Sequence, residues 1–147
     1  MSLSDRLNED MKLAMKSQDK FKLSVIRMVR AAIKNIEIDQ RKTLEEQEVL
    51  DVLNREVKQR KDSLQEFEKA GREDLAENLR AEIAILMEYM PQQLSDEEVK
   101  AIVQQTIQEV GASSKADMGK VMGALMPKVK GRADGKVVNQ FVQQLLN

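Results

Sequence analysis

The chain has 147 residues and contains no cysteine, no histidine and no tryptophan. It can therefore form neither disulfides nor thiolate or imidazole metal sites, and it has no cysteine or histidine for nucleophilic or acid–base catalysis. The side chains left for chemistry are aspartate, glutamate, lysine, arginine, serine, threonine and a single tyrosine, Tyr89. The lack of cysteine fits a reducing compartment, and we expect a cytoplasmic protein.

Aromatic residues make up only 3% of the chain, and there are two prolines. Charged residues account for 33% and hydrophobic residues for 41%, a balance typical of a helical protein and too apolar for disorder. No run approaches the roughly 20 apolar residues of a membrane span, and the first twelve residues contain no apolar signal-peptide core. We expect a soluble all-α protein with no membrane association.

Apolar residues recur at helical spacing in seven stretches, which turn and capping signals separate. Thr43–Glu46 and Ser95–Glu98 have the capping-box pattern that opens a helix, and Pro91 ends one. The predicted helices cover residues 3–17, 20 to about 42, the Thr43 cap to Ala70, about 72–90, the Ser95 cap to Gly111, near 116 to about Val129, and the stretch after Gly135. We predict an N-terminal subdomain of about four longer helices (1–93) and a small three-helix bundle (94–147), joined through Pro91–Leu94.

The formal net charge of −1 conceals a local excess of basic residues near the end of the chain. Residues 115–147 contain Asp117, Asp134 and six basic residues: Lys115, Lys120, Lys128, Lys130, Arg132 and Lys136. Such a segment is either an electrostatic footprint for an anion or an ordinary solvated face.

Two glycine pairs in this segment call for an explanation. Gly131–Gly135 is one residue too short for a P-loop and lacks its serine or threonine, so we interpret it as a helix connector whose glycines supply positive φ and whose Asp134 caps the last helix. Gly119 and Gly123 lie four residues apart in a predicted helix, at a cost of about 1 kcal/mol each relative to alanine. They smooth one helix face, either for a packed helix or for an approaching nucleic-acid backbone, with Lys120 as a phosphate contact.

No catalytic or metal-binding pattern stands out. The basic cluster in residues 55–61 is interspersed with acids at i, i+4 spacing, which favours surface ion pairs. Acidic pairs at helical spacing are abundant in a chain this charged, and no apolar pocket converges on them. We expect no catalytic residue, no metal and no cofactor.

Several segments, taken in order, resemble the pattern of the YqeY family. They are Lys58-Gln-Arg60-Lys-Asp62-Ser63, Gly71-Arg72-Glu-Asp74-Leu75, Tyr89-Met-Pro91, Asp117-Met-Gly119-Lys120-Val-Met122-Gly123 and Lys130-Gly131-Arg132-Ala133-Asp134-Gly135. The resemblance extends from about residue 3 to the end of the chain.

The resemblance implies a small helical protein, similar at its C-terminal end to the tail domain of the glutamyl/aspartyl-tRNA amidotransferase, which helps to hold the tRNA body. By carry-over it implies RNA-binding positions at Gly119, Lys120, Gly123, Gly131 and Arg132. Lys128, Lys130 and Lys136 are added by charge and proximity. The amidotransferase's catalytic apparatus is not part of the resemblance, so the family association with glutamine-dependent carbon–nitrogen ligases implies no independent activity of this chain.

Two hypotheses follow. In the first, the chain is a non-catalytic, monomeric module that binds tRNA or another structured RNA by shape and phosphate contacts, and charge reversal at Lys128, Lys130, Arg132 and Lys136 abolishes binding. In the second, it is a protein-interaction module that docks helix against helix on a synthetase, an amidotransferase or another partner in aminoacyl-tRNA metabolism, without RNA contact.

Overall fold

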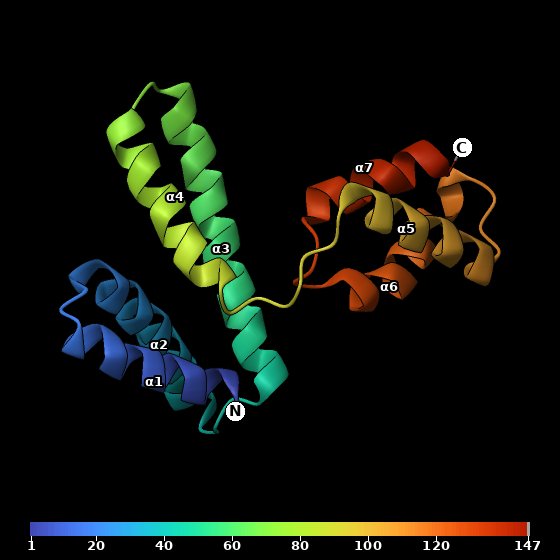
Figure 1. Ribbon diagram of the computed structural model, residues 1–147. Helices are drawn as coiled ribbons and strands as arrows, with labels where there is room; N and C mark the ends of the chain where they lie inside the picture. Colours follow the sequence, from blue (N-terminus) through green and yellow to red (C-terminus); the bar gives the residue numbers. More distant parts are fainter. Residues whose placement is uncertain (147) are drawn as a thin grey trace. The chain divides into compact units, whose positions relative to one another are not determined.

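The computed structural model describes residues 1–146, which form seven α-helices, one short 3₁₀ turn and no strand (Figure 1). The all-α fold class is confirmed. The chain divides into two compact units, Met1–Met90 (unit 1) and Pro91–Asn147 (unit 2). The sequence pattern had placed this division at Leu94. Residues 91–93 go with unit 2 because the Gln93 side-chain amide donates to the Gly131 carbonyl at 2.8 Å. None of the helices of the described residues is both long and apolar enough to span a membrane.

Unit 1 consists of two helical hairpins. Helices α1 (Leu3–Lys16) and α2 (Lys20–Gln40) form the first, and α3 (Glu46–Lys69) and α4 (Glu73–Met87) form the second (Figure 1). Their apolar stripes meet in one core, which contains Leu7, Val25, Ile26, Val29, Ile33, Leu44, Val49, Val52, Leu53, Val57, Leu86 and Tyr89. Helices α1 and α2 cover the first half of α3, and α4 runs back along α3 from its far end (Figure 1).

The start of α3 differs from the prediction, because the Thr43–Glu46 capping box does not form. Leu44 is buried in the core and its N–H donates to the Glu37 carboxylate at 2.9 Å, so residues 43–45 stay outside the helix. The N-cap is Glu45, whose N–H donates to the Glu48 carboxylate at 3.1 Å. The Glu46 carboxylate instead accepts the Leu3 N–H at 2.8 Å, at the start of α1.

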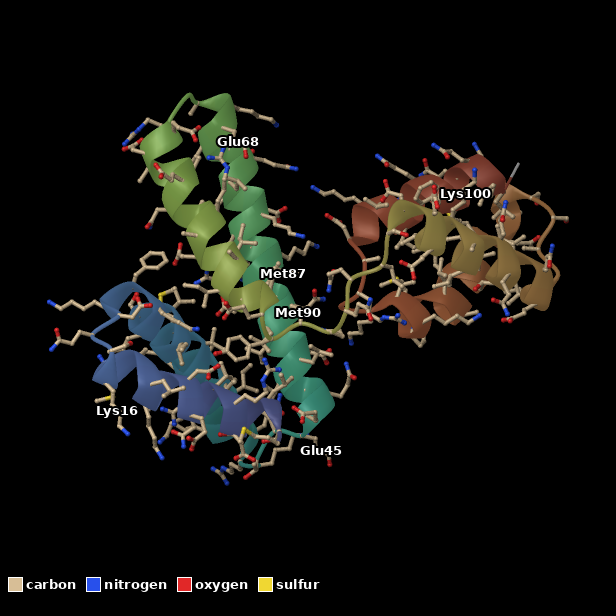
Figure 2. The ribbon with its side chains drawn as sticks, viewed as in Figure 1. Lys16, Glu45, Glu68, Met87, Met90 and Lys100 are labelled. Atoms are coloured by element: carbon tan, nitrogen blue, oxygen red, sulfur yellow. The ribbon has the colours of Figure 1, made fainter. Side chains whose placement is uncertain are left out.

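Helix α4 ends at Met87, three residues before the predicted end, because Tyr89 turns into the core. The Tyr89 hydroxyl donates to the Asp10 carboxylate. The Arg6 guanidinium lies 5.0 Å from the centre of the Tyr89 ring and donates to the Glu88 carbonyl at 3.0 Å. Met87, which precedes this turn, and Met90, which follows Tyr89, also pack against the core of unit 1; Figure 2 labels both. These contacts fasten α1 to the end of α4.

Unit 2 contains α5 (Asp96–Val110), a 3₁₀ turn (Lys115–Asp117), α6 (Met118–Val129) and α7 (Gly135–Leu145). The Ser95–Glu98 capping box is confirmed, with the Ser95 hydroxyl accepting the Glu98 N–H at 3.2 Å. Pro127 lies in the last turn of α6, which continues to Val129. The core of unit 2 contains Val99, Val103, Val121, Leu125, Val129, Val138, Val142 and Leu146.

The buried tyrosine generates the first prediction. Burial and the Asp10 carboxylate raise the pKa of Tyr89 above its ordinary value of 10.0. Because the folded state favours the neutral phenol, the contribution of Tyr89 to the free energy of unfolding is fully present below pH 10. It is lost as the pH rises through the folded-state pKa of Tyr89. Tyr89 is the only tyrosine and there is no tryptophan, so tyrosinate absorbance reports this group alone. We expect the titration at higher pH in the folded protein than in urea.

The Tyr89→Phe variant should lower the free energy of unfolding at neutral pH by about 1–2 kcal/mol, because the Asp10 carboxylate loses its phenol partner. Urea denaturation measures this loss. An identical tyrosinate titration in the folded and unfolded protein would contradict the burial of the hydroxyl, and an unchanged stability of Tyr89→Phe would contradict a stabilising bond to Asp10.

Candidate nucleic-acid interface

The residues predicted to bind RNA lie on α6, on the loop that follows it and on the first turn of α7. Each residue of an α-helix is rotated by about 100° from the one before, so sequence offsets give the face on which each position lies. Gly119, Gly123 and Lys130, the C-cap of α6, fall within about 40° of one another on this count, and Lys120 flanks them. All four residues are exposed.

The glycine face of α6, which we define as Gly119, Gly123 and the exposed Met126 and Pro127, is uncovered. A Cβ atom built on Gly119 or Gly123 meets no heavy atom within 4 Å. Neither glycine has a positive φ, so the backbone conformation does not require glycine at either position. Close packing by another helix of unit 2 is therefore not the reason for these glycines among the described residues.

Lys128 lies on the opposite side of α6 from Gly119, about 180° away. Its ammonium donates to the Glu109 carboxylate at 2.7 Å and to the Thr106 hydroxyl at 3.0 Å, both on α5. Thr106 is fully buried, and its hydroxyl donates in turn to the Ile102 carbonyl at 2.8 Å. Lys128 thus joins α6 to α5, and the structure does not bring it together with the other candidates.

The loop after α6 is a connector, as predicted. Gly131 is buried and has a φ of 74°, which glycine adopts without strain. Asp134 caps α7, with its carboxylate accepting the Lys136 N–H at 2.9 Å. Gly135 does not have a positive φ, contrary to the expectation for both loop glycines, because it is already the first residue of α7.

Three cations lie around this loop: Lys130, Arg132 and Lys136. The Arg132 carbonyl accepts the Leu94 N–H at 2.8 Å, which holds the loop against the entry to α5. The Ser95 N–H and hydroxyl, with a smaller contribution from the Arg132 guanidinium, hold the pKa of Glu98 below its ordinary value. Lys130 and Lys136 are exposed.

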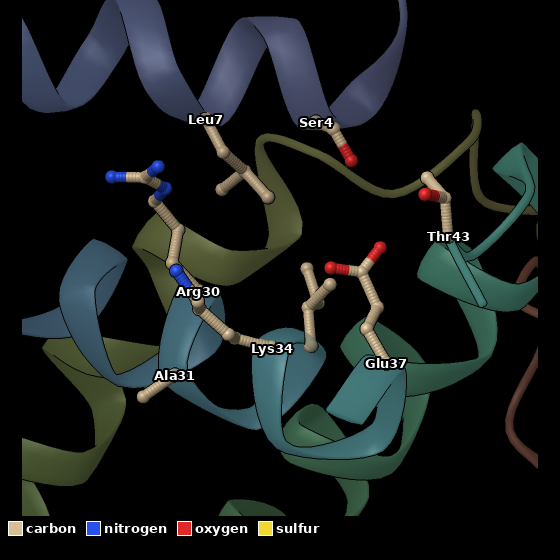
Figure 3. A pocket seen from close by; sticks show the side chains of 8 residues that line it. Ser4, Leu7, Arg30, Ala31, Lys34, Glu37 and Thr43 are labelled. Carbon is tan, nitrogen blue, oxygen red and sulfur yellow. The ribbon is translucent and has the colours of Figure 1, made fainter. Parts of the chain in front are cut away.

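In the part of the chain that the structure describes, no group of three or more acidic side chains could hold a metal ion. Within the basic cluster on α3, Arg60 pairs with Glu56 at 3.0 Å and with Glu82 at 3.7 Å. An open pocket of about 460 Å³ in unit 1 has walls of mixed charge, including Arg30, Lys34 and Glu37 (Figure 3).

Sequence reasoning missed the Lys128–Thr106–Glu109 contact. Thr106 follows Val99 and Val103 at helical spacing, a signal that it lies on the buried face of its helix. A buried hydroxyl needs a partner, and a lysine on an adjacent helix can supply it. The sequence does not indicate which of the six basic residues in 115–147 contacts α5.

Together, the helical fold and this surface define a small all-α protein with an uncovered glycine face beside a cation-bearing loop. A family model described as Yqey-like protein matches residues 4–146. The chain therefore belongs to the YqeY family, as its resemblance to that family implied.

Curated relatives carry the name "Altered inheritance of mitochondria protein 41, mitochondrial". The protein of Pyrenophora tritici-repentis is 29% identical over 144 residues, covering 96% of this chain and 79% of that protein. Those of Kluyveromyces lactis and Lachancea thermotolerans are 42% and 38% identical, covering 73% and 74% of this chain. The matched part of the chain spans about 60% of the length of these last two relatives.

The expected cytoplasmic location was wrong, because these relatives are named as mitochondrial proteins. The expectation relied on the lack of cysteine. A chain without thiols has no disulfides to lose, so its composition does not distinguish one compartment from another.

The uncovered glycines generate the second prediction. Gly119→Ala and Gly123→Ala should each raise the free energy of unfolding of unit 2 by up to about 1 kcal/mol, because alanine is the better helix former and its Cβ meets open space. Thermal or urea denaturation of the full chain measures the gain. A loss of stability instead would mean that another part of the protein packs against this face.

The third prediction concerns Lys128. Lys128→Gln should lower the stability of unit 2 by about 0.5–1 kcal/mol, because it removes the contact to Thr106 and the partly exposed ion pair with Glu109. Lys120→Gln, which changes an exposed lysine of the same helix, is the matched control. Equal stability of the two variants would contradict a joining role for Lys128.

Proposed function

We propose that this member of the YqeY family is a non-catalytic module that binds tRNA or another structured RNA through unit 2. The observation that carries the proposal is the uncovered glycine face of α6 with Lys120 and Lys130 beside it. Two glycines that reduce helix stability and pack against no described residue of unit 2 are accounted for if an external backbone approaches them closely.

The residues assigned to the interface are Gly119, Lys120, Gly123, Lys130, Gly131, Arg132 and Lys136. Lys128 is left out because Glu109 and Thr106 hold its ammonium. Lysine and arginine at the surface are the usual phosphate contacts, and they fix position without reading sequence. Gly131 acts through the backbone, since its positive φ sets the direction in which Arg132 leaves the helix.

Recognition by shape and phosphate fits the scarcity of aromatic side chains in unit 2. Sequence-specific RNA readers stack unpaired bases on exposed rings. The one aromatic residue of unit 2, Phe141, is half-buried and packs on the core. The likeness to the amidotransferase tail adds support, since that tail holds the body of a tRNA.

The fourth prediction is tested by binding of the full chain to total tRNA over a salt series. We expect log K to fall linearly with log salt, at a slope of about −0.7 to −0.9 for each phosphate contact. The Lys120→Gln/Lys130→Gln/Lys136→Gln variant should bind more weakly, with a slope smaller in magnitude by about 2 to 3. Glutamine keeps helix propensity close to that of lysine, so the fold is retained.

Two controls accompany this variant. Arg55→Gln/Lys58→Gln/Lys69→Gln removes the same charge from exposed residues of α3 and should leave the slope unchanged. Gly123→Leu adds bulk to the glycine face without changing charge and should weaken binding at every salt concentration. The proposal fails if the wild-type chain binds no tRNA at low salt, or if the two triple variants weaken binding equally. The first outcome would favour docking to a protein partner.

A further inference from the structure

Helix α2 carries a second set of cations, well away in sequence from those of unit 2. Lys20, Arg27, Arg30 and Lys34, which we call the α2 stripe, are all exposed. Their offsets place them within about 80° of one another around the helix, spread over about 21 Å of its length. Between Asp19 and Lys42 there are seven basic and three acidic residues, whereas the rest of unit 1 has ten basic and sixteen acidic residues.

The cations of the α2 stripe have no acidic partners in the described part of the chain, unlike many of the other cations in unit 1. Lys12, Lys22, Lys42, Arg60, Arg72 and Arg80 all form ion pairs there. No ion pair joins any of the four stripe residues to a described residue; the Arg30 guanidinium instead contacts the Met11 sulfur at 2.8 Å. Lys20 also stands in the first turn of α2, where the helix dipole disfavours a cation.

The acids nearest to the stripe in sequence are Asp19, next to Lys20, and Glu37. The Asp19 carboxylate accepts the Lys22 N–H at 3.1 Å. Glu37 lines the unit 1 pocket with Arg30 and Lys34, and its carboxylate accepts the Leu44 N–H. Figure 3 shows this carboxylate on the side of the pocket where Ser4 and Thr43 lie. Arg30 and Lys34 are exposed and form no ion pair with Glu37 among the described residues.

The opposite face of α2 is committed to the core through Val25, Ile26, Val29 and Ile33. This distinguishes the stripe from a membrane-binding helix, which must bury a continuous apolar face in the lipid. The large exposed apolar residues of α2 are Phe21, Met28 and Ile38, and of these Ile38 lies on the side of the helix that carries the stripe. A line of like charges with two guanidinium groups, which bind phosphate oxygens in pairs, matches a chain of phosphates.

We propose that the α2 stripe is a second RNA-binding surface, which contacts phosphates along the backbone of a structured RNA. The proposal takes its class of ligand from the proposed function but lies on the other unit and on different residues. It adds phosphate contacts on unit 1 to those proposed for unit 2, and each set contributes to the salt dependence of binding.

The test is binding of the full chain to total tRNA over a salt series. The Arg27→Gln/Arg30→Gln/Lys34→Gln variant should weaken binding and lower the magnitude of the slope by about 2 to 3. Because Arg30 contacts Met11, a second variant, Arg27→Gln/Lys34→Gln, leaves that contact in place and should lower it by about 1.5 to 2. Arg55→Gln/Lys58→Gln/Lys69→Gln is the matched control on α3, and circular dichroism checks the fold of each variant.

The outcomes separate this proposal from the preceding one. If the stripe variants behave like the α3 control while the unit 2 variant loses binding, the α2 stripe is overturned and the proposed function stands. If only the stripe variants lose binding, the stripe stands and the unit 2 site is wrong. No binding by the wild-type chain at low salt overturns both. Stripe-dependent binding to phosphatidylserine-containing vesicles, without binding to tRNA, overturns the stripe as an RNA surface in favour of a membrane.

Discussion

The buried face of α3 is the constraint on which unit 1 depends. Val49, Val52, Leu53 and Val57 lie in the first half of this helix and are covered by α1 and α2, while the second half is covered by α4. A 24-residue helix cannot bury its apolar stripe against one short partner, so two hairpins share it. Because α2 must turn Val25, Ile26, Val29 and Ile33 inward, its cations are left on the outside. The charge pattern of the surface is in this sense a consequence of the core.

The two units handle their charges differently. In unit 1, Arg60 and Arg80 on α3 and α4 pair with acids; the pairs of Arg80 are exposed and therefore weak, whereas the Arg60–Glu56 pair is half-buried. In unit 2, Lys128 joins two helices, whereas Lys130, Arg132 and Lys136 lie around one loop. A net charge of −1 summed over the chain describes neither arrangement, since binding of a polyanion depends on where cations gather at the surface.

Much of the fold could be predicted from the sequence, because the helices have regular apolar periodicity and clear stops. The Ser95 cap and the role of Asp134 depend on contacts between residues close in sequence, which local patterns describe well. The errors arose where a distant contact decides. Leu44 enters the core and displaces the Thr43 cap, Tyr89 reaches Asp10 and ends α4 early, and Lys128 reaches Thr106 on another helix. None of these partners can be found by counting residues along one helix.

The loop after α6 is also bonded to the segment through which the chain enters unit 2. Gln93 donates to the Gly131 carbonyl, and Leu94 donates to the carbonyl of Arg132, the next residue. These two bonds couple the position of residues 93–94 to that of the cation-bearing loop. A molecule that binds Arg132 therefore also restrains the segment ahead of α5, and a movement of that segment shifts the loop.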